Sequence, residues 1–216
     1  MCRPRRKLKP TFIIFCEGDT EHNYFKGMKK NEDLAISLKA INMKGGGYTN
    51  FLKELKKSSN SNSIAKFVII DLDVLIDNIN ENENFDELIN YCKIQNRTSS
   101  IPIFLIINNP DFEYIACLHS SAYKNQDYKK FIEKTFNYKD IDKFKSDDKV
   151  YTFLTSKDNS INNMLSKLNC NKYIKNKYSI KKKTMDIKID ETILNKNNTA
   201  IKGSNIDEFF EILRKF

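Results

Sequence analysis

The amino-acid sequence predicts an α/β fold, with a mostly parallel sheet flanked by helices and a small C-terminal extension. Short apolar runs rich in Ile, Val and Phe recur along the first half of the chain, and amphipathic stretches separate them. The 216 residues include only 6 Gly and 4 Pro, which argues against a disordered or fibrous class. Strands that alternate with helices are typical of parallel βαβ units with right-handed crossovers.

The first half of the chain contains four predicted strands, each a short apolar run of the kind found in buried parallel sheets. These strands are expected at 11–16, 34–43, 66–74 and 101–108. Apolar stripes at helical spacing predict the helices between and after them, at 20–30, 48–57, 83–96 and 109–123. Asp19 or Thr20 is expected to cap the first helix, and Pro110 to lie near the first turn of the last one.

The second half has a weaker pattern. It predicts helices at 128–136 and 158–174, strands at 149–156 and 184–190, and an amphipathic helix at 205–216. The terminal helix either covers its own core or docks a partner. We therefore divide the chain into a main domain at 10–178 and an extension at 179–216, packed on or beside it.

The charge and the cysteines limit the class of protein. A formal net charge of +9 favours nucleic acid as a partner, although a solvated Lys-rich surface is the alternative. Lys181, Lys182 and Lys183 are the predicted nucleic-acid-binding cluster. The 5 cysteines form no CxxC pair, so a reducing cytoplasm is expected. The apolar run after the basic N-terminus is too short for a signal peptide or a membrane span.

Polar residues follow three of the predicted strands. Glu17, Asp71, Asp73 and Asn109 all fall at carboxyl ends, where functional groups of parallel sheets collect. Two aspartates one residue apart at a strand end can turn toward one ion, and Mg²⁺ prefers such oxygen ligands. The predicted first strand can lie beside the third, which would bring Glu17 to the aspartates.

Three stretches carry a resemblance to a known family: "CEGDTEHNYFKG", "IDLD" and "NNPDFEYIACLH". Together they resemble the RloB-like family of Toprim proteins over roughly residues 11 to 120. Relatives often read D-R-D or D-x-D-E, whereas this chain has Leu72 and Val74 at those places. The resemblance implies a Toprim, Rossmann-like sheet and a Mg²⁺- or Mn²⁺-dependent endonuclease that cleaves DNA or RNA, including tRNA, in bacterial antiphage defence.

The resemblance also implies site residues and a partner. Glu17, Glu21, Asp71 and Asp73 would hold one or two metal ions, with Glu21 on the helix face four residues after Glu17. The alternative for Glu21 is a capping carboxylate in the first turn of the helix, and for Asp71 and Asp73 it is a solvated turn at the strand end. An ABC-type ATPase would come from another chain, because this one lacks a G-x-x-x-x-G-K-[ST] loop.

Four further residues have both a functional and a structural interpretation. Glu113 is a catalytic candidate or a helix-capping carboxylate, and His119 orients the site or is a buried structural histidine. Asn109 orients the site or caps the following helix. Lys157, after the predicted strand at 149–156, is a catalytic candidate that would place a cation near the scissile phosphate, although any lysine is a weak signal in this chain.

Two other classes of function stay open at this point. The chain could be a regulatory or toxin subunit that its partner keeps inactive. It could also bind nucleic acid without cleaving it. The sequence also leaves open whether the chain forms a homo-oligomer.

Overall fold

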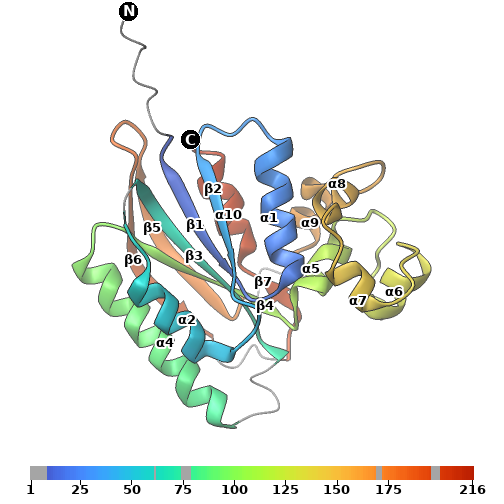
Figure 1. The fold of residues 1–216 in the computed structure, drawn as a ribbon, viewed down its shortest axis with the longest axis horizontal. Helices are drawn as coiled ribbons and strands as arrows, with labels where there is room; N and C mark the ends of the chain where they lie inside the picture. The colour runs from blue at the N-terminus through green and yellow to red at the C-terminus, as the bar shows by residue number, and fades with distance from the viewer. Residues whose placement is uncertain (1–8, 61, 74–78, 169–171, 196–199) are drawn as a thin grey trace, which may run out of the picture.

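A five-stranded sheet forms the centre of the fold, in the strand order β2-β1-β3-β4-β7 (Figure 1). The computed structural model describes residues 9–60, 62–73, 79–168, 172–195 and 200–216. The strands are β1 (Thr11–Cys16), β2 (Ser37–Asn42), β3 (Ser63–Asp71), β4 (Ile103–Asn109) and β7 (Gly203–Ser204).

The first four strands run parallel, and β7 joins β4 in antiparallel pairing. All four parallel strands therefore end at the same edge of the sheet. β1 lies between β2 and β3. Glu17, which follows β1, is therefore next to the end of β3, where Asp71 and Asp73 lie. The predicted α/β class with a mostly parallel sheet is confirmed.

Helices cover both faces of this sheet (Figure 1). Their bounds are α1 (Asp19–Asn31), α2 (Gly47–Lys57), α4 (Ile79–Thr98), α5 (Phe112–Leu118), α6 (Tyr128–Lys134), α7 (Ile141–Lys145), α8 (Val150–Leu154), α9 (Ile161–Lys167) and α10 (Ile206–Leu213). Side chains alternate between the two faces of β1, because successive residues of a strand point to opposite sides. Phe12 and Ile14 pack with α1 and α10, whereas Ile13 and Phe15 pack with α2 and α4.

The predicted strand at 149–156 is wrong, because its main part forms α8. Val150, Tyr151 and Leu154 are the buried residues of this segment. Their spacing is that of one helix face, so the short apolar run was assigned the wrong period. The first helix also begins differently from the prediction. Gly18 is its N-cap residue and no side chain caps it, since Asp19 instead accepts a hydrogen bond from Asn42 at 2.5 Å.

The predicted helix at 158–174 is shorter than expected. α9 ends at Lys167, and its cap is Ser160, whose hydroxyl accepts from the Asn163 amide at 3.0 Å. The chain then forms β5 (Ile174–Lys181), which pairs with β6 (Asp186–Leu194) as an antiparallel hairpin. β5 was not predicted, whereas β6 contains most of the strand expected at 184–190.

The C-terminal helix packs into the main core. The ring of Phe209 lies 5.0 Å from those of Phe25 and Phe67 and 6.3 Å from that of Phe12, between ring centres. Phe209 is thus covered by the chain's own core, whereas Phe210 and Leu213 of the same helix line a cavity. The docking of a partner by this helix stays a prediction. The proposed boundary between 178 and 179 falls inside β5, and the division into 10–178 and 179–216 remains a prediction.

Among the described residues, none of the helices combines the length and the apolar character that a membrane crossing requires.

Candidate acidic site at the carboxyl edge of the sheet

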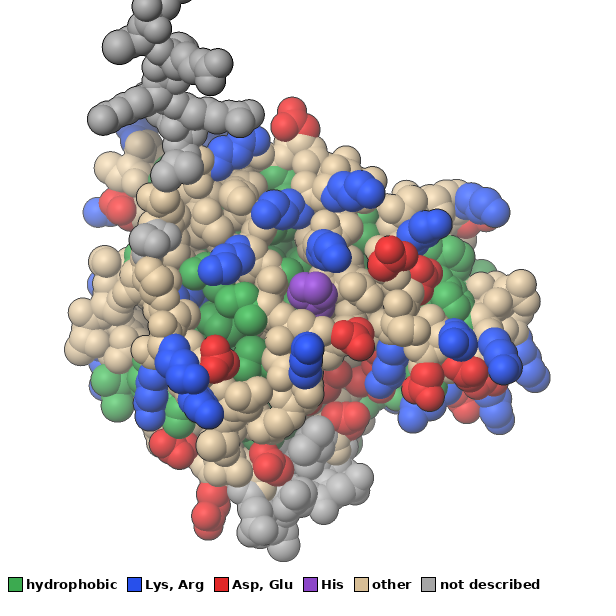
Figure 2. Space-filling view, viewed as in Figure 1, with side chains coloured by type: hydrophobic (Ala, Val, Ile, Leu, Met, Phe, Trp, Pro, Cys, Tyr) green, Lys and Arg blue, Asp and Glu red, His purple; other side chains and the backbone are tan. Residues whose placement is uncertain are grey.

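Five acidic residues occupy the edge at which the parallel strands end. Glu17 follows β1, Asp71 is the last residue of β3, and Asp73 comes two residues later. Glu21 and Glu113 lie in the first turns of α1 and α5. In the space-filling view, acidic side chains gather near this edge, with basic side chains beside them over α6 and α7 (Figure 2).

Glu17 is tied directly to the third strand. The backbone amide of Asp71 donates to Glu17 Oε2 at 2.9 Å, and this bond joins residues 54 positions apart in the sequence. The pairing of β1 with β3 makes the contact possible. The structure therefore brings Glu17 and Asp71 together, as the order of the strand ends predicts.

The side chain of Asp71 is oriented by Asn108. Asn108 Nδ2 donates to Asp71 Oδ1 at 3.0 Å, because Asp71 and Asn108 are paired residues of β3 and β4. The Ser204 hydroxyl donates in turn to Asn108 Oδ1 at 2.8 Å. Sequence reasoning singled out Asn109 and missed Asn108; the register of β3 against β4, which places Asn108 beside Asp71, was the missing information.

Glu113 is buried beside the other acids of this edge. Its side chain accepts a hydrogen bond from Thr20 Oγ1 at 2.6 Å, and Lys145 Nζ lies 3.5 Å from Glu113 Oε2. The cap of α5 is Asp111, whose Oδ1 accepts from the Tyr114 amide at 2.9 Å. Glu113 lies in the first turn of the same helix, and its carboxylate also accepts from its own backbone amide, so a role at the helix start and a role in the site are both compatible with the structure. Thr20 and Lys145 are neighbours of Glu113 that the sequence did not reveal.

The carboxylates of this edge interact electrostatically. Burial, together with the charges of Glu113 and Glu17, raises the pKa of Glu21 to about 8. Burial likewise raises the pKa of Glu17 to about 7, with Asp73 and Glu113 adding to the rise. The pKa of Asp71 is raised by burial and then by Glu21, Glu17 and Glu113. Acids that resist ionisation together in this way are favourable ligands for a cation.

One oxygen of this edge lacks a hydrogen bond. Glu21 is 3% exposed, and its Oε1 is buried with no hydrogen-bond partner. A buried carboxylate oxygen without a partner is costly unless a proton or a cation satisfies it. The donor set therefore fits a hard divalent cation by its chemistry and charge. As the described side chains stand, however, no three His, Cys, Asp or Glu residues are grouped closely enough to hold a metal ion.

Comparison with known proteins identifies the family. A family model described as "RloB-like protein" matches residues 12–208. The chain belongs to the RloB-like family. No curated protein and no solved structure matches it.

Two of the predicted orienting residues of this RloB-like chain point away from the carboxylates. Asn109 Nδ2 donates to the Ile201 carbonyl oxygen at 2.8 Å. His119 is 1% exposed, and its Nδ1 lies 3.0 Å from the Leu154 carbonyl oxygen, while its Nε2 faces the Tyr24 hydroxyl at 3.4 Å. These contacts connect α5 to α1 and α8, which is a structural role for His119.

The predicted lysines lie elsewhere in the RloB-like fold. Lys157 is an exposed turn residue after α8 and does not follow a strand. Lys181 ends β5, and it lines a cavity together with Pro102, which precedes β4. Lys181, Lys182 and Lys183 are therefore at the amino end of the sheet, opposite the acids. Lys145, which the sequence interpretation did not single out, lies beside the acidic edge, 3.5 Å from Glu113 Oε2.

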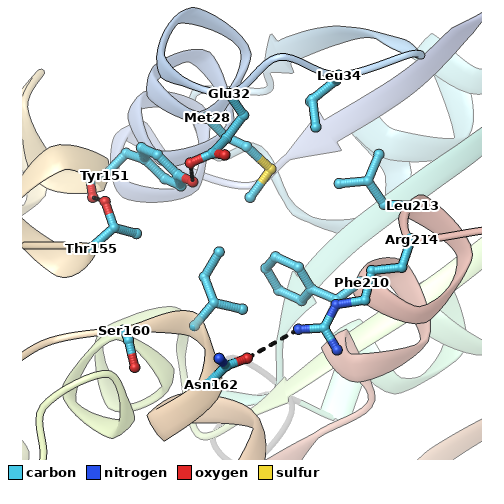
Figure 3. Close-up of a pocket in the computed structure, with 11 residues that line it drawn as sticks. Met28, Glu32, Leu34, Tyr151, Thr155, Ser160, Asn162, Phe210, Leu213 and Arg214 are labelled. Carbon is cyan, nitrogen blue, oxygen red and sulfur yellow. Dashed lines mark hydrogen bonds between the residues drawn. The ribbon is translucent and has the colours of Figure 1, made fainter. Parts of the chain in front are cut away.

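A cavity of about 370 Å³ opens on another part of the RloB-like chain (Figure 3). Met28, Leu213 and Phe210 form its apolar lining, and Glu32 and Arg214 stand on its rim. It lies at the last turns of α1 and α10, whereas Glu21 is in the first turn of α1, roughly 15 Å away along a helix. This cavity and the acidic edge are thus different places.

His119 makes a testable contribution to stability. Burial lowers its pKa to about 4, so the unfolded chain binds a proton between about pH 6.5 and 4 that the folded chain does not. The stability that the neutral, buried His119 contributes is fully present above pH 6.5. Up to about 3 kcal/mol of the free energy of unfolding is lost as the pH falls to 4. His119→Asn keeps a donor for the Leu154 carbonyl and does not titrate. Urea unfolding at several pH values should show a shallower acid loss in His119→Asn than in the wild type, and equal slopes would contradict the assignment.

Proposed function

We propose that this RloB-like chain is a metal-dependent nuclease with a Toprim-type acidic site, which hydrolyses phosphodiester bonds in DNA or RNA. The observation that carries the proposal is the group of buried, interacting carboxylates at the strand ends, with Glu21 Oε1 left without a hydrogen-bond partner. The family resemblance extends the proposal to antiphage defence alongside an ABC-type ATPase. In that case the ATPase would be supplied by another chain.

Glu17, Glu21, Asp71 and Asp73 are the residues that would hold Mg²⁺ or Mn²⁺. When bound, such an ion lowers the pKa of a water molecule and neutralises negative charge on a phosphate. The chain's own residues prepare this site. Asn108 fixes the side chain of Asp71, and the Tyr48 hydroxyl donates to the Asp71 carbonyl oxygen at 3.1 Å.

Glu113 and Lys145 are the proposed acid–base and electrostatic elements beside the metal ligands. Burial lowers the pKa of Lys145, but the charges of Glu113, Asp111 and Asp71 outweigh this effect and raise it overall. The ammonium group therefore stays charged, and it can balance negative charge that develops on a phosphate. Lys145 takes the place that the sequence interpretation gave to Lys157.

The test is cleavage of DNA and RNA in Mg²⁺ or Mn²⁺ by the wild type and by Asp71→Asn. Asn is close in shape to Asp but is neutral, so we expect cleavage to fall by at least about 100-fold while the fold is retained. Asp190→Asn is the matched control, because Asp190 is an exposed residue of the β5–β6 hairpin.

Both proteins are also assayed with the ABC-type ATPase that the family resemblance implies. Equal cleavage by the wild type and by Asp71→Asn would show that the acidic edge is not the active site. No cleavage under any of these conditions would overturn the nuclease and favour a nucleic-acid-binding or regulatory subunit.

A further inference from the structure

A lysine is held over two tyrosine rings next to the acidic edge. Lys202 Nζ lies 5.6 Å from the ring centre of Tyr114 and 5.5 Å from that of Tyr128. A second lysine, Lys129, lies 5.9 Å from the Tyr128 ring centre. Cation–π contacts at these distances attract an ammonium group and restrict its position without neutralising its charge.

The same group is anchored to the ends of β4 and α5. The Tyr128 hydroxyl donates to Asp111 Oδ2 at 2.5 Å, and Asp111 is the cap of the helix that carries Glu113. The residue before Lys202 is fixed by the bond from Asn109 Nδ2 to the Ile201 carbonyl oxygen. Lys202 is thus placed by two elements that also build the acidic edge.

Lys202 keeps its charge available to an external anion. Its side chain is exposed, and within the described residues no carboxylate lies at ion-pair distance from its Nζ. Lys145, in contrast, is paired with Glu113. Buried carboxylates repel the phosphates of a nucleic acid, so a substrate that reaches them needs cations at the entrance.

We propose that Lys202, held over Tyr114 and Tyr128 and assisted by Lys129, binds a backbone phosphate of the nucleic acid beside the acidic edge. This inference rests on the proposed function and names a binding path for its substrate. It differs from the sequence interpretation, in which Lys181, Lys182 and Lys183 bind the backbone. Those three residues lie at the other end of the sheet, roughly 20 Å away along a seven-residue strand such as β4.

The experiment measures binding of fluorescent single-stranded DNA and RNA oligonucleotides by anisotropy, in EDTA to prevent cleavage, at several salt concentrations. Lys202→Ala is expected to weaken binding about 5- to 10-fold at low salt and to reduce the slope of log K against log salt by about 1. Lys202→Arg keeps the cation and should restore binding. Lys30→Ala, at the far end of α1, is the control, and a Lys182→Ala/Lys183→Ala variant tests the competing path.

The outcomes separate this inference from the proposed function. If Lys202→Ala, shown to be folded by its thermal unfolding, binds with wild-type affinity and salt slope, the phosphate site is wrong, even where Asp71→Asn has abolished cleavage. A loss confined to the Lys182→Ala/Lys183→Ala variant would also overturn it. If Lys202→Ala loses binding and the wild type does not cleave nucleic acid, the phosphate site would be supported and the proposed nuclease activity would be wrong. No nucleic-acid binding by the wild type would overturn both.

Discussion

Phe209→Ala is expected to lower the free energy of unfolding by about 3–5 kcal/mol, because it removes a fully buried aromatic side chain and leaves a cavity. Phe209 is 0% exposed and contacts rings from β1, α1 and β3. Chemical denaturation followed by circular dichroism would measure the change. The loss should appear in the unfolding of the whole chain, since α10 closes the same core as the N-terminal strands.

Lys215→Ala is the control for this prediction, because Lys215 is an exposed residue just after α10. Its free energy of unfolding should stay within about 0.5 kcal/mol of the wild type. A separate, early unfolding step in Phe209→Ala, with the rest of the chain unaffected, would contradict a shared core. It would instead support the extension at 179–216 as an independent unit.

Glu21→Gln is expected to stabilise the metal-free chain at alkaline pH. The pKa of Glu21 is raised by burial and its acidic neighbours to about 8, so the folded state disfavours the charged form. The destabilisation is absent below about pH 4.5, grows as the pH rises, and is complete above about pH 8. Gln removes this cost, because its amide group carries no charge. At pH 8.5 in EDTA we expect a gain of about 2–4 kcal/mol, which narrows toward pH 5.

Thermal and urea unfolding would measure the stability of both proteins at each pH, without Mg²⁺ and with it. Under the proposed function, Mg²⁺ stabilises the wild type by RT ln(1 + [Mg²⁺]/Kd) and stabilises Glu21→Gln less. Glu133→Gln, an exposed substitution on α6, controls for the loss of a surface charge. A Glu21→Gln variant with the stability and pH dependence of the wild type would show that the burial of this carboxylate has no energetic consequence.

The candidate site illustrates how far strand ends can be interpreted from sequence. Glu17 and Asp71 were expected to meet because parallel strands end at one edge, and a 2.9 Å hydrogen bond joins them. Asn108 was missed because the register between β3 and β4 decides which of two adjacent asparagines faces Asp71. A shift of one residue would exchange the two side chains between the faces of the sheet.

The positions of the proposed functional lysines, in contrast, could not be predicted from the sequence. Lys157 was chosen for its place after a predicted strand, but that segment is a helix and Lys145 occupies the position beside Glu113. A chain with 37 Lys and Arg residues gives no local signal that separates one lysine from another. Proximity between α7 and α5, or between Lys202 and two tyrosines, arises from packing of segments that are distant in sequence.

By itself the sequence determined the α/β class, the four parallel strands and the acids at their ends, because apolar runs and their polar boundaries are local properties. Tertiary structure alone decided which groups complete the site. Thr20, Asn108 and Lys145 reach the carboxylates through helix packing and strand register, which depend on contacts across the whole core. The same long-range contacts place the lysine-rich hairpin turn at the opposite end of the sheet from the acids.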